Sequence, residues 1–149
     1  PEEVDIRYIN SPFKHLKNML PKNKGSRFEK ITSDVYTKLG YNVEKSNDTS
    51  YDRLINKRKC EIKGSTLAKN TDTFSFLQIR PDQNYDVMIF ALFYPQELCL
   101  LEMDKKMICK HIDANVFKKQ HGGNKANSRT YCYYGNKETL LSLGAKEIQ

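Results

Sequence analysis

Three ionisable side chains, Asp52, Glu61 and Lys63, lie close together in the sequence at spacings that suit metal chemistry. Asp52 falls in an apolar, strand-like run at 51–55, and the other two fall in a second run at 59–64. The short link between the runs predicts a hairpin loop, which brings Asp52 close to Glu61 across the strand pair. Side chains two apart on a strand leave the same face, so Glu61 and Lys63 are expected to point together.

Two carboxylates held side by side repel each other, and a hard divalent cation relieves that repulsion. Mg²⁺ takes oxygen ligands from one or two carboxylates together with water and phosphate oxygens. Such a metal polarises a phosphodiester and activates a water, while Lys63 would orient that water or stabilise developing charge. The simpler interpretation is a solvated hairpin with a Glu–Lys pair, which the pattern E-x-K favours when it is taken alone.

A helix predicted before the hairpin is the first element that must position these side chains. Residues 27–39 predict this helix because apolar residues recur there at spacings of three and four. The stripe consists of Phe28, Ile31, Val35 and Leu39. The stretch before it, 21–26, predicts a basic loop that ends at Ser26, a candidate N-cap. Gly40 is expected to end the helix.

The remaining runs predict a sheet. Strands are expected at 41–45, 85–94 and 98–103, and the near-continuous apolar run 85–94 indicates a central strand that is buried on both faces. Residues 74–80 are compatible with either helix or strand, and Asn136 is expected to cap a short helix. The element order predicts one α/β (α+β) domain over 1–149, with a central mixed β-sheet flanked by helices.

Composition favours a polyanionic partner. The 149 residues contain 25 Lys and Arg against 18 Asp and Glu, a formal net charge of +7 that is typical of nucleic-acid-binding domains but also of merely soluble ones. No stretch approaches the roughly 18 apolar residues of a membrane span, and no secretory signal is recognisable. The four cysteines form no C-x-x-C pair, so reduced thiols and a cytoplasmic location are expected.

The run 25–65 resembles the PD-(D/E)XK nuclease superfamily, the fold of many restriction endonucleases. That family has an acidic residue on a helix, a strand, an Asp on a second strand and E-x-K on a third. Glu29 matches the helix acid, and Asp52 matches the motif aspartate although Tyr rather than Pro precedes it. Glu61 and Lys63 match the E-x-K pair, and the resemblance extends to about residue 94.

The resemblance implies a restriction-endonuclease-like core over about 23–105 and a cofactor, Mg²⁺, for which Mn²⁺ can substitute. The metal ligands would be Asp52, Glu61 and the backbone carbonyl of Ile62. Glu29 would support a second metal or orient the water; its alternative is an exposed helix glutamate. A polar residue after the E-x-K strand often faces the site in restriction-type nucleases, and here Gln78 is the candidate, with Arg80 nearby.

Two basic stretches are candidates for DNA contact. Lys24 and Arg27 precede or begin the Glu29 helix and would grip the phosphate backbone. The region about 106–135 contains a Gly-rich loop whose residues can neutralise phosphates or read base edges. The residues singled out there are His121, Asn124, Lys125 and Arg129. The alternative for this stretch is an ordinary flexible surface loop.

These expectations predict a metal-dependent DNA endonuclease that hydrolyses phosphodiesters in double-stranded DNA, with a type II-like restriction enzyme as the preferred biology. Cutting both strands with one active site per chain favours a homodimer or sequential nicking. One rival is a structure-specific or repair nuclease of the same fold, such as a junction resolvase. The other is a basic nucleic-acid-binding module in which the E-x-K pattern is incidental.

Overall fold

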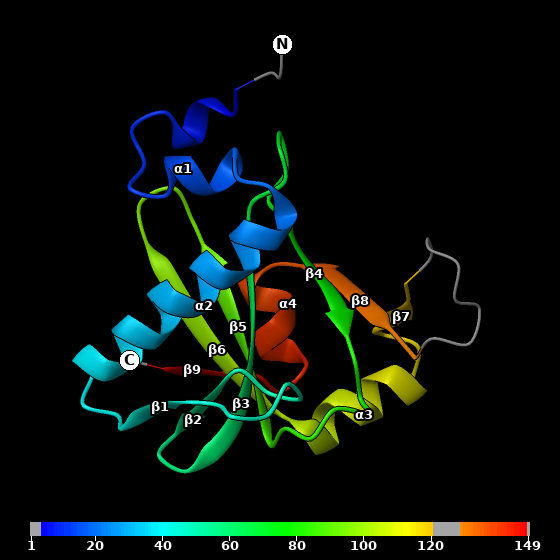
Figure 1. Ribbon diagram of the computed structural model, residues 1–149. Coiled ribbons are helices and arrows are strands. Elements are labelled where there is room, and N and C mark those ends of the chain that lie inside the picture. Colours follow the sequence, from blue (N-terminus) through cyan, green and yellow to red (C-terminus); the bar gives the residue numbers. More distant parts are fainter. Residues whose placement is uncertain (1–3, 121–128, 149) are drawn as a thin grey trace.

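The computed structural model describes residues 4–120 and 129–148, and their main feature is a mixed six-stranded sheet (Figure 1). The strand order is β1-β2-β3-β5-β6-β9. These strands are β1 (Val43–Lys45), β2 (Arg53–Ile55), β3 (Arg58–Thr66), β5 (Val87–Phe93), β6 (Leu98–Asp104) and β9 (Lys146–Ile148). Only the β3–β5 pair of this sheet is parallel. The predicted α+β class with a central mixed sheet is confirmed.

One face of this sheet is covered by a second, smaller sheet. Its antiparallel strands have the order β4-β8-β7, and residues 74–80, compatible with helix or strand in the sequence, form strand β4. Helices α3 and α4 pack on the same side, and the core there joins Phe76, Tyr133 and Ile108 to Phe90 of β5. The bounds are β4 (Phe74–Ile79), β7 (Lys118–Lys119), β8 (Tyr131–Gly135), α3 (Lys105–Asp113) and α4 (Lys137–Ser142).

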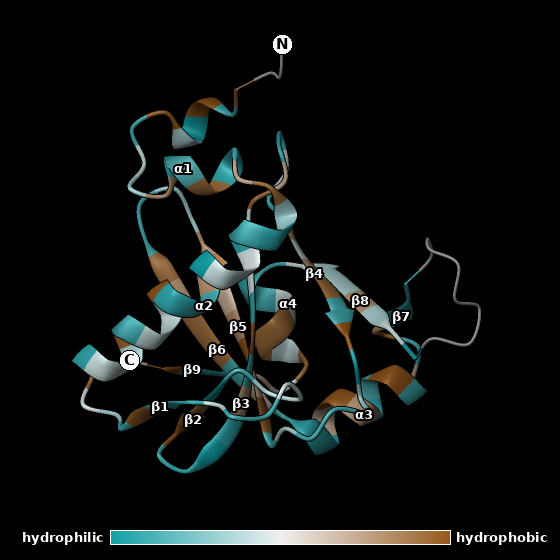
Figure 2. Cartoon of the chain, in the orientation of Figure 1, coloured by the Kyte–Doolittle hydropathy of each residue, from teal (hydrophilic) through white to brown (hydrophobic). Residues whose placement is uncertain are grey.

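The opposite face of the sheet is covered by helix α2 (Pro21–Lys38), which runs across the central strands (Figure 1). Strand β5 separates the two cores: Met88, Phe90 and Leu92 face the small sheet, whereas Ile89 and Phe93 face α2. All seven residues of β5 are buried, so the prediction of a central strand buried on both faces is confirmed. Figure 2 shows brown hydrophobic residues along the central strands and teal on much of α2.

The start of α2 differs from the sequence expectation. The stretch 21–26, predicted as a loop, forms the first turns of the helix, and Ser26 lies inside it rather than at its N-cap. Pro21 occupies the first helical turn, where its missing N–H has no helical partner to lose. The predicted end is confirmed, because Gly40 has a φ of 96° just after the helix.

The buried stripe of α2 is also narrower and more polar than predicted. Phe28 and Tyr36 are buried, but Thr32 lies between them, and Leu39 is 44% exposed. The predicted stripe omits Thr32 and Tyr36 because both side chains carry hydroxyl groups and were not counted as apolar. The Tyr36 hydroxyl donates to Glu102 at 2.7 Å.

Two contacts fix α2 on the sheet. Near its start, Phe28 lies directly over Gly64 of β3, where a Cβ atom would come within 2.4 Å of the Phe28 ring. Near its end, Tyr36 reaches Glu102 of β6, which also accepts two hydrogen bonds from the Arg58 guanidinium at 2.8 and 3.0 Å. The helix is therefore held close to β3 at the level of Glu29, which follows Phe28.

The predicted hairpin is present with a tighter turn. Asn56 and Lys57, both with positive φ, form a two-residue connection between β2 and β3. Arg58, expected in the loop, is the first residue of β3, and Asp52 lies just before β2 rather than within it. Cys60 and Ile62, which alternate with Glu61 and Lys63 along β3, are both buried beneath α2.

Helix α3 was not predicted. It begins after Asp104, whose side chain accepts a hydrogen bond from the Met107 N–H at 2.8 Å. Its buried residues, Ile108 and His111 among them, contribute to the core. The region predicted as DNA-contacting, about 106–135, therefore includes a packing element. The predicted helix after Asn136 is confirmed, with Asn136 in a capping box.

The N-terminal segment lies over one end of the sheet and contains η1 (Ile6–Tyr8) and α1 (Lys14–Lys17) (Figure 1). In the part of the chain that the structure describes, no helix is long and apolar enough to cross a membrane. All four cysteines are free thiols, and three of them are buried.

Replacing Gly64 by Ala is expected to destabilise the protein by about 1–3 kcal/mol, because the new methyl group meets Phe28 and overpacks the contact between α2 and β3. The free energy of unfolding in urea measures this effect. The matched control is Gly25→Ala inside α2, where a Cβ has no neighbour within 4 Å and should stabilise the helix by about 0.5–1 kcal/mol. Equal stabilities of the two variants would contradict the close approach of α2.

Candidate active site

A cavity of about 550 Å³ opens between α2, β3 and β4. All five residues predicted as catalytic line it, although they come from four separate segments. These residues are Glu29, Asp52, Glu61, Lys63 and Gln78. The predicted backbone ligand, Ile62, and one predicted DNA contact, Lys24, line it as well. Their catalytic and binding roles stay predictions, but the structure brings them together.

The side chain of Asp52 takes the place of a missing strand partner. The Asp52 N–H donates to the Cys60 carbonyl at 2.9 Å and continues the β2–β3 ladder by one bond. The next backbone group on this edge of β3, the Ile62 N–H, donates to Asp52 Oδ2 at 2.7 Å instead of to a strand. The backbone pairing between β2 and β3 therefore ends at this point. The Asp52 carboxylate accepts the hydrogen bond of the Ile62 N–H, which has no strand partner there.

The same arrangement determines where the Ile62 carbonyl points. In a strand, the N–H and C=O of one residue project to the same side, and those of the next residue project to the opposite side. Because the Ile62 N–H points toward Asp52, its carbonyl also points to the edge that β2 has left, away from β5. The predicted backbone ligand therefore faces the cavity beside the Asp52 carboxylate.

Glu61 is the most buried of the acidic residues in the cavity, with only 8% of its surface exposed. Burial, followed by the adjacent Asp52 carboxylate, raises the pKa of Glu61 to about 8. Lys63 opposes this shift: its Nζ lies 3.7 Å from Glu61 Oε2. A single lysine at that distance does not neutralise the carboxylates that surround it.

Glu29 approaches the same group from α2. Burial, followed by the Asp52 carboxylate, raises the pKa of Glu29 to about 7. Arg53 is its nearest cation, with Nη1 3.7 Å from Glu29 Oε1. The alternative of an exposed helix glutamate is wrong, because this side chain is half-buried beside the sheet.

The donor set suits a hard divalent cation. Asp52 and Glu61 offer carboxylate oxygens and Ile62 offers a backbone carbonyl. A cation between them would lower the pKa of Glu61, which burial and the adjacent Asp52 raise. Among residues 4–120 and 129–148, no group of three or more His, Cys, Asp or Glu side chains is arranged to hold a metal by itself. The candidate donor set is two carboxylates and a carbonyl, and Glu29 lines the same cavity while paired with Arg53.

Comparison with solved structures finds chains of similar fold. The structure of a bacterial homing endonuclease, I-Ssp6803I, superposes with a TM-score of 0.50 at 13% sequence identity, covering 79% of this chain and 76% of that one. The chain shares its fold with this nuclease. No protein-family model matches the sequence, and no curated protein matches it either. The PD-(D/E)XK resemblance therefore depends on the motif residues and their geometry.

Gln78 lies at the far wall of the cavity in an unusual backbone conformation. Its φ is 56°, and the β4–β8 pairing is irregular between Phe76 and Ile79. The Gln78 N–H donates to the Gln120 side-chain oxygen at 2.7 Å. This bulge turns two successive residues, Leu77 and Gln78, toward the cavity.

The predicted DNA contacts lie at varying distances from this cavity. Lys24 lines it, whereas Arg27 and Arg80 are exposed outside its lining. Arg129 pairs with Asp82 at 2.8 Å on the surface. The other three, His121, Asn124 and Lys125, lie outside the described residues.

Sequence reasoning missed three residues of this neighbourhood. Arg53 follows Asp52 directly, but nothing in the sequence pairs it with Glu29. The Ser65 hydroxyl accepts a hydrogen bond from the Ser75 N–H at 2.9 Å and fastens β4 beside β3. Lys17 enters from α1, and only the tertiary structure brings it to the cavity.

The raised pKa values predict a pH-dependent stability. A carboxyl whose pKa is raised by folding binds more protons in the native state between its ordinary value of 4.5 and its folded value. The free energy of unfolding of the metal-free protein should therefore fall as pH rises from about 5 to 8. Glu61→Gln should remove the larger share of this fall, measured as the melting temperature in EDTA at each pH.

The matched control for this measurement is Glu44→Gln on exposed strand β1, which should keep the wild-type pH profile. A Glu61→Gln profile that coincides with that of the wild type would contradict the crowding of carboxylates in the cavity.

Proposed function

We propose that the chain is a Mg²⁺-dependent DNA endonuclease that hydrolyses phosphodiester bonds at the edge of β3. The observation that carries this proposal is the convergence of Asp52, Glu61, Lys63 and the Ile62 backbone in one cavity. The similarity of the fold to a homing endonuclease supports it. The basic composition, with a net charge of +7, suits a polyanionic substrate.

In this proposal Asp52, Glu61 and the Ile62 carbonyl hold Mg²⁺, and Mn²⁺ can take its place. The bound metal supplies charge neutralisation at the phosphate and a water of lowered pKa. Asp52 is suited to binding because its other carboxylate oxygen is fixed by the Ile62 N–H at 2.7 Å, so its orientation exists before a ligand arrives.

Lys63 places a positive charge beside these ligands. Its ammonium group lies 3.7 Å from Glu61 and carries only hydrogen-bond donors, so it can orient a water oxygen or stabilise the negative charge of the transition state. Glu29, held by Arg53 on the other side, can accept a hydrogen bond from the attacking water. Gln78 can donate to the phosphate from the opposite wall.

The proposed substrate is double-stranded DNA, cut in a sequence-directed manner as by a type II-like restriction enzyme. One solved structure of similar fold is a homing endonuclease, and this supports endonuclease activity on DNA. One such cavity per chain can serve both strands if two chains act together, so a homodimer is part of the proposal.

Replacing Lys63 by Ala should lower the rate of DNA cleavage in Mg²⁺ by about 10²–10⁴-fold, because the water loses its oriented donor. Glu61→Ala should abolish detectable cleavage. The measurement is the conversion of unmethylated supercoiled plasmid to linear DNA and discrete fragments. The matched control is Lys59→Ala, on the same face of β3 four residues away and outside the cavity lining.

Cleavage that survives both Lys63→Ala and Glu61→Ala would contradict the assignment of the site. Wild-type protein that binds the plasmid but never cuts it would favour the non-catalytic binding module. Preferential cutting of a four-way junction over the plasmid would favour a resolvase instead of a restriction-type enzyme.

A further inference from the structure

The active-site cavity extends beyond its three carboxylates, along both α2 and β3. Its α2 wall runs from Glu29 back to Pro21, roughly 12 Å at the rise of a helix. Its β3 wall runs from Glu61 to Thr66, roughly 16 Å at the rise of a strand. Both walls are longer than a metal ion and its ligands require. We call the extension the outer arm; it is lined by Pro21, Lys24 and Gly25 of α2 and by Ser65 and Thr66 of β3.

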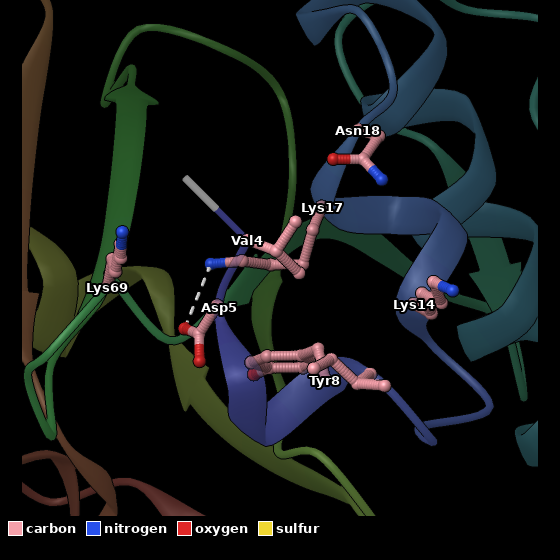
Figure 3. Close-up of a pocket in the computed structure, with 8 residues that line it drawn as sticks. Val4, Asp5, Tyr8, Lys14, Lys17, Asn18 and Lys69 are labelled. Atoms are coloured by element: carbon pink, nitrogen blue, oxygen red, sulfur yellow. Dashed lines mark ion pairs between the residues drawn. The ribbon is translucent and has the colours of Figure 1, made fainter. Parts of the chain in front are cut away.

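The far end of the outer arm is closed by the N-terminal segment. Lys17 lines the active-site cavity and also a second cavity, of about 440 Å³, beside that segment (Figure 3). Its ammonium group donates to the Leu67 carbonyl at 2.6 Å and lies 3.7 Å from Asp5 Oδ2, the ion pair that is dashed in Figure 3. Because these contacts already engage Lys17, it acts as a fixed wall, and the outer arm has defined limits.

Gly25 leaves the α2 wall of the outer arm without a side chain. Among the described residues, no atom lies within 4 Å of the position that a Cβ would take there. Two other glycines have structural reasons: Gly64 makes room for Phe28, and Gly40 has a positive φ. Gly25 has neither reason, although glycine inside a helix is unfavourable relative to alanine. A helical glycine that lines a cavity suits a place where a ligand comes close to the protein backbone.

Gly25 is also well placed relative to the proposed chemistry. It precedes Glu29 by four residues, so both lie on the same face of α2, about 6 Å apart along the helix axis. The three acidic residues of the cavity lining are all at the other end, and Lys24 adds a positive charge beside Gly25. A DNA strand whose phosphate lies at the carboxylates can therefore continue past Gly25 without meeting a side chain or a negative charge.

We propose that the sugar–phosphate backbone of the cut strand passes directly against α2 at Gly25, next to the scissile phosphate. This inference rests on the proposed function, because the strand enters the outer arm only if its neighbouring phosphate occupies the candidate metal site. The absent side chain makes the room that the strand needs. The contact is to the DNA backbone, so it positions the strand and reads no bases.

The test places two side chains of equal size and different charge at this position, Gly25→Gln and Gly25→Glu. Binding to a fluorescent duplex is measured by anisotropy, with Ca²⁺ in place of Mg²⁺. Gly25→Gln should weaken binding about 10-fold or more, because the new side chain overpacks against the strand. Gly25→Glu should weaken it by about a further 5–10-fold at low salt, since a carboxylate then faces a phosphate, and added salt should shrink this difference.

The matched controls are Ser26→Gln and Ser26→Glu, at the next residue of α2, which is exposed and outside the cavity lining. Ser26→Gln should keep the wild-type affinity, and Ser26→Glu measures the long-range effect of one added negative charge. The melting temperature of Gly25→Gln should be no lower than that of the wild type, because the space around a Cβ is open and Gln favours a helix more than Gly does. Weaker binding by an equally stable protein cannot come from unfolding.

Equal affinities of Gly25→Gln and Ser26→Gln would overturn the inference, even while wild-type protein cuts DNA in Mg²⁺. So would a Gln-to-Glu difference at position 25 no larger than that at position 26, because the outer arm would then hold no phosphate. The expected losses in a protein that binds DNA but never cuts it would support the contact and contradict the nuclease function. Wild-type protein that neither binds nor cuts DNA would overturn both.

Discussion

The candidate site depends on one hydrogen bond, from the Ile62 N–H to the Asp52 carboxylate. A strand that loses its neighbour exposes backbone groups, and burying them without partners is unfavourable. The Asp52 side chain accepts the hydrogen bond of the first such group, the Ile62 N–H. The β2–β3 pairing can therefore end there and make room for the cavity. The carboxylate, the adjacent carbonyl and Glu61 then share one edge of the sheet. The opening of the strand pair and the candidate ligand set thus have a single cause.

Packing on the two faces of the sheet holds this edge in place. Phe28 on Gly64 holds α2 close to β3, so that Glu29 lines the same cavity as Asp52, and Glu102 fixes the far end of the helix through Tyr36 and Arg58. On the other face, the small sheet contributes Gln78 through the β4 bulge. The resulting group is electrostatically unfavourable without a cation, since burial and mutual repulsion raise the pKa of Glu61 and Glu29. The folded state is therefore less stable at the site where the proposed chemistry needs negative charge.

Local patterns predicted much of this arrangement. Alternation in β3 revealed that Glu61 and Lys63 share a face, and the apolar run of β5 revealed the central strand. Boundaries are less predictable: the sequence predicts a loop at 21–26, where α2 begins, because its Lys, Asn and Gly residues show no helical spacing of apolar residues. Helix α3 went unrecognised, although Asp104 was available as its N-cap. The Arg53–Glu29 pair and the place of Lys17 between two cavities follow from tertiary contacts alone, which no spacing in the sequence encodes.

The central claim is that Asp52, Glu61 and the Ile62 carbonyl form one metal site. Anomalous diffraction from a crystal soaked in Mn²⁺ tests it most directly, because the ion is located without any assumption about activity. We expect a single strong peak in contact with an oxygen of each of these three residues, and its loss in crystals of Glu61→Gln. A peak elsewhere on the protein, or an Ile62 carbonyl turned into a hydrogen bond with another strand, would contradict it.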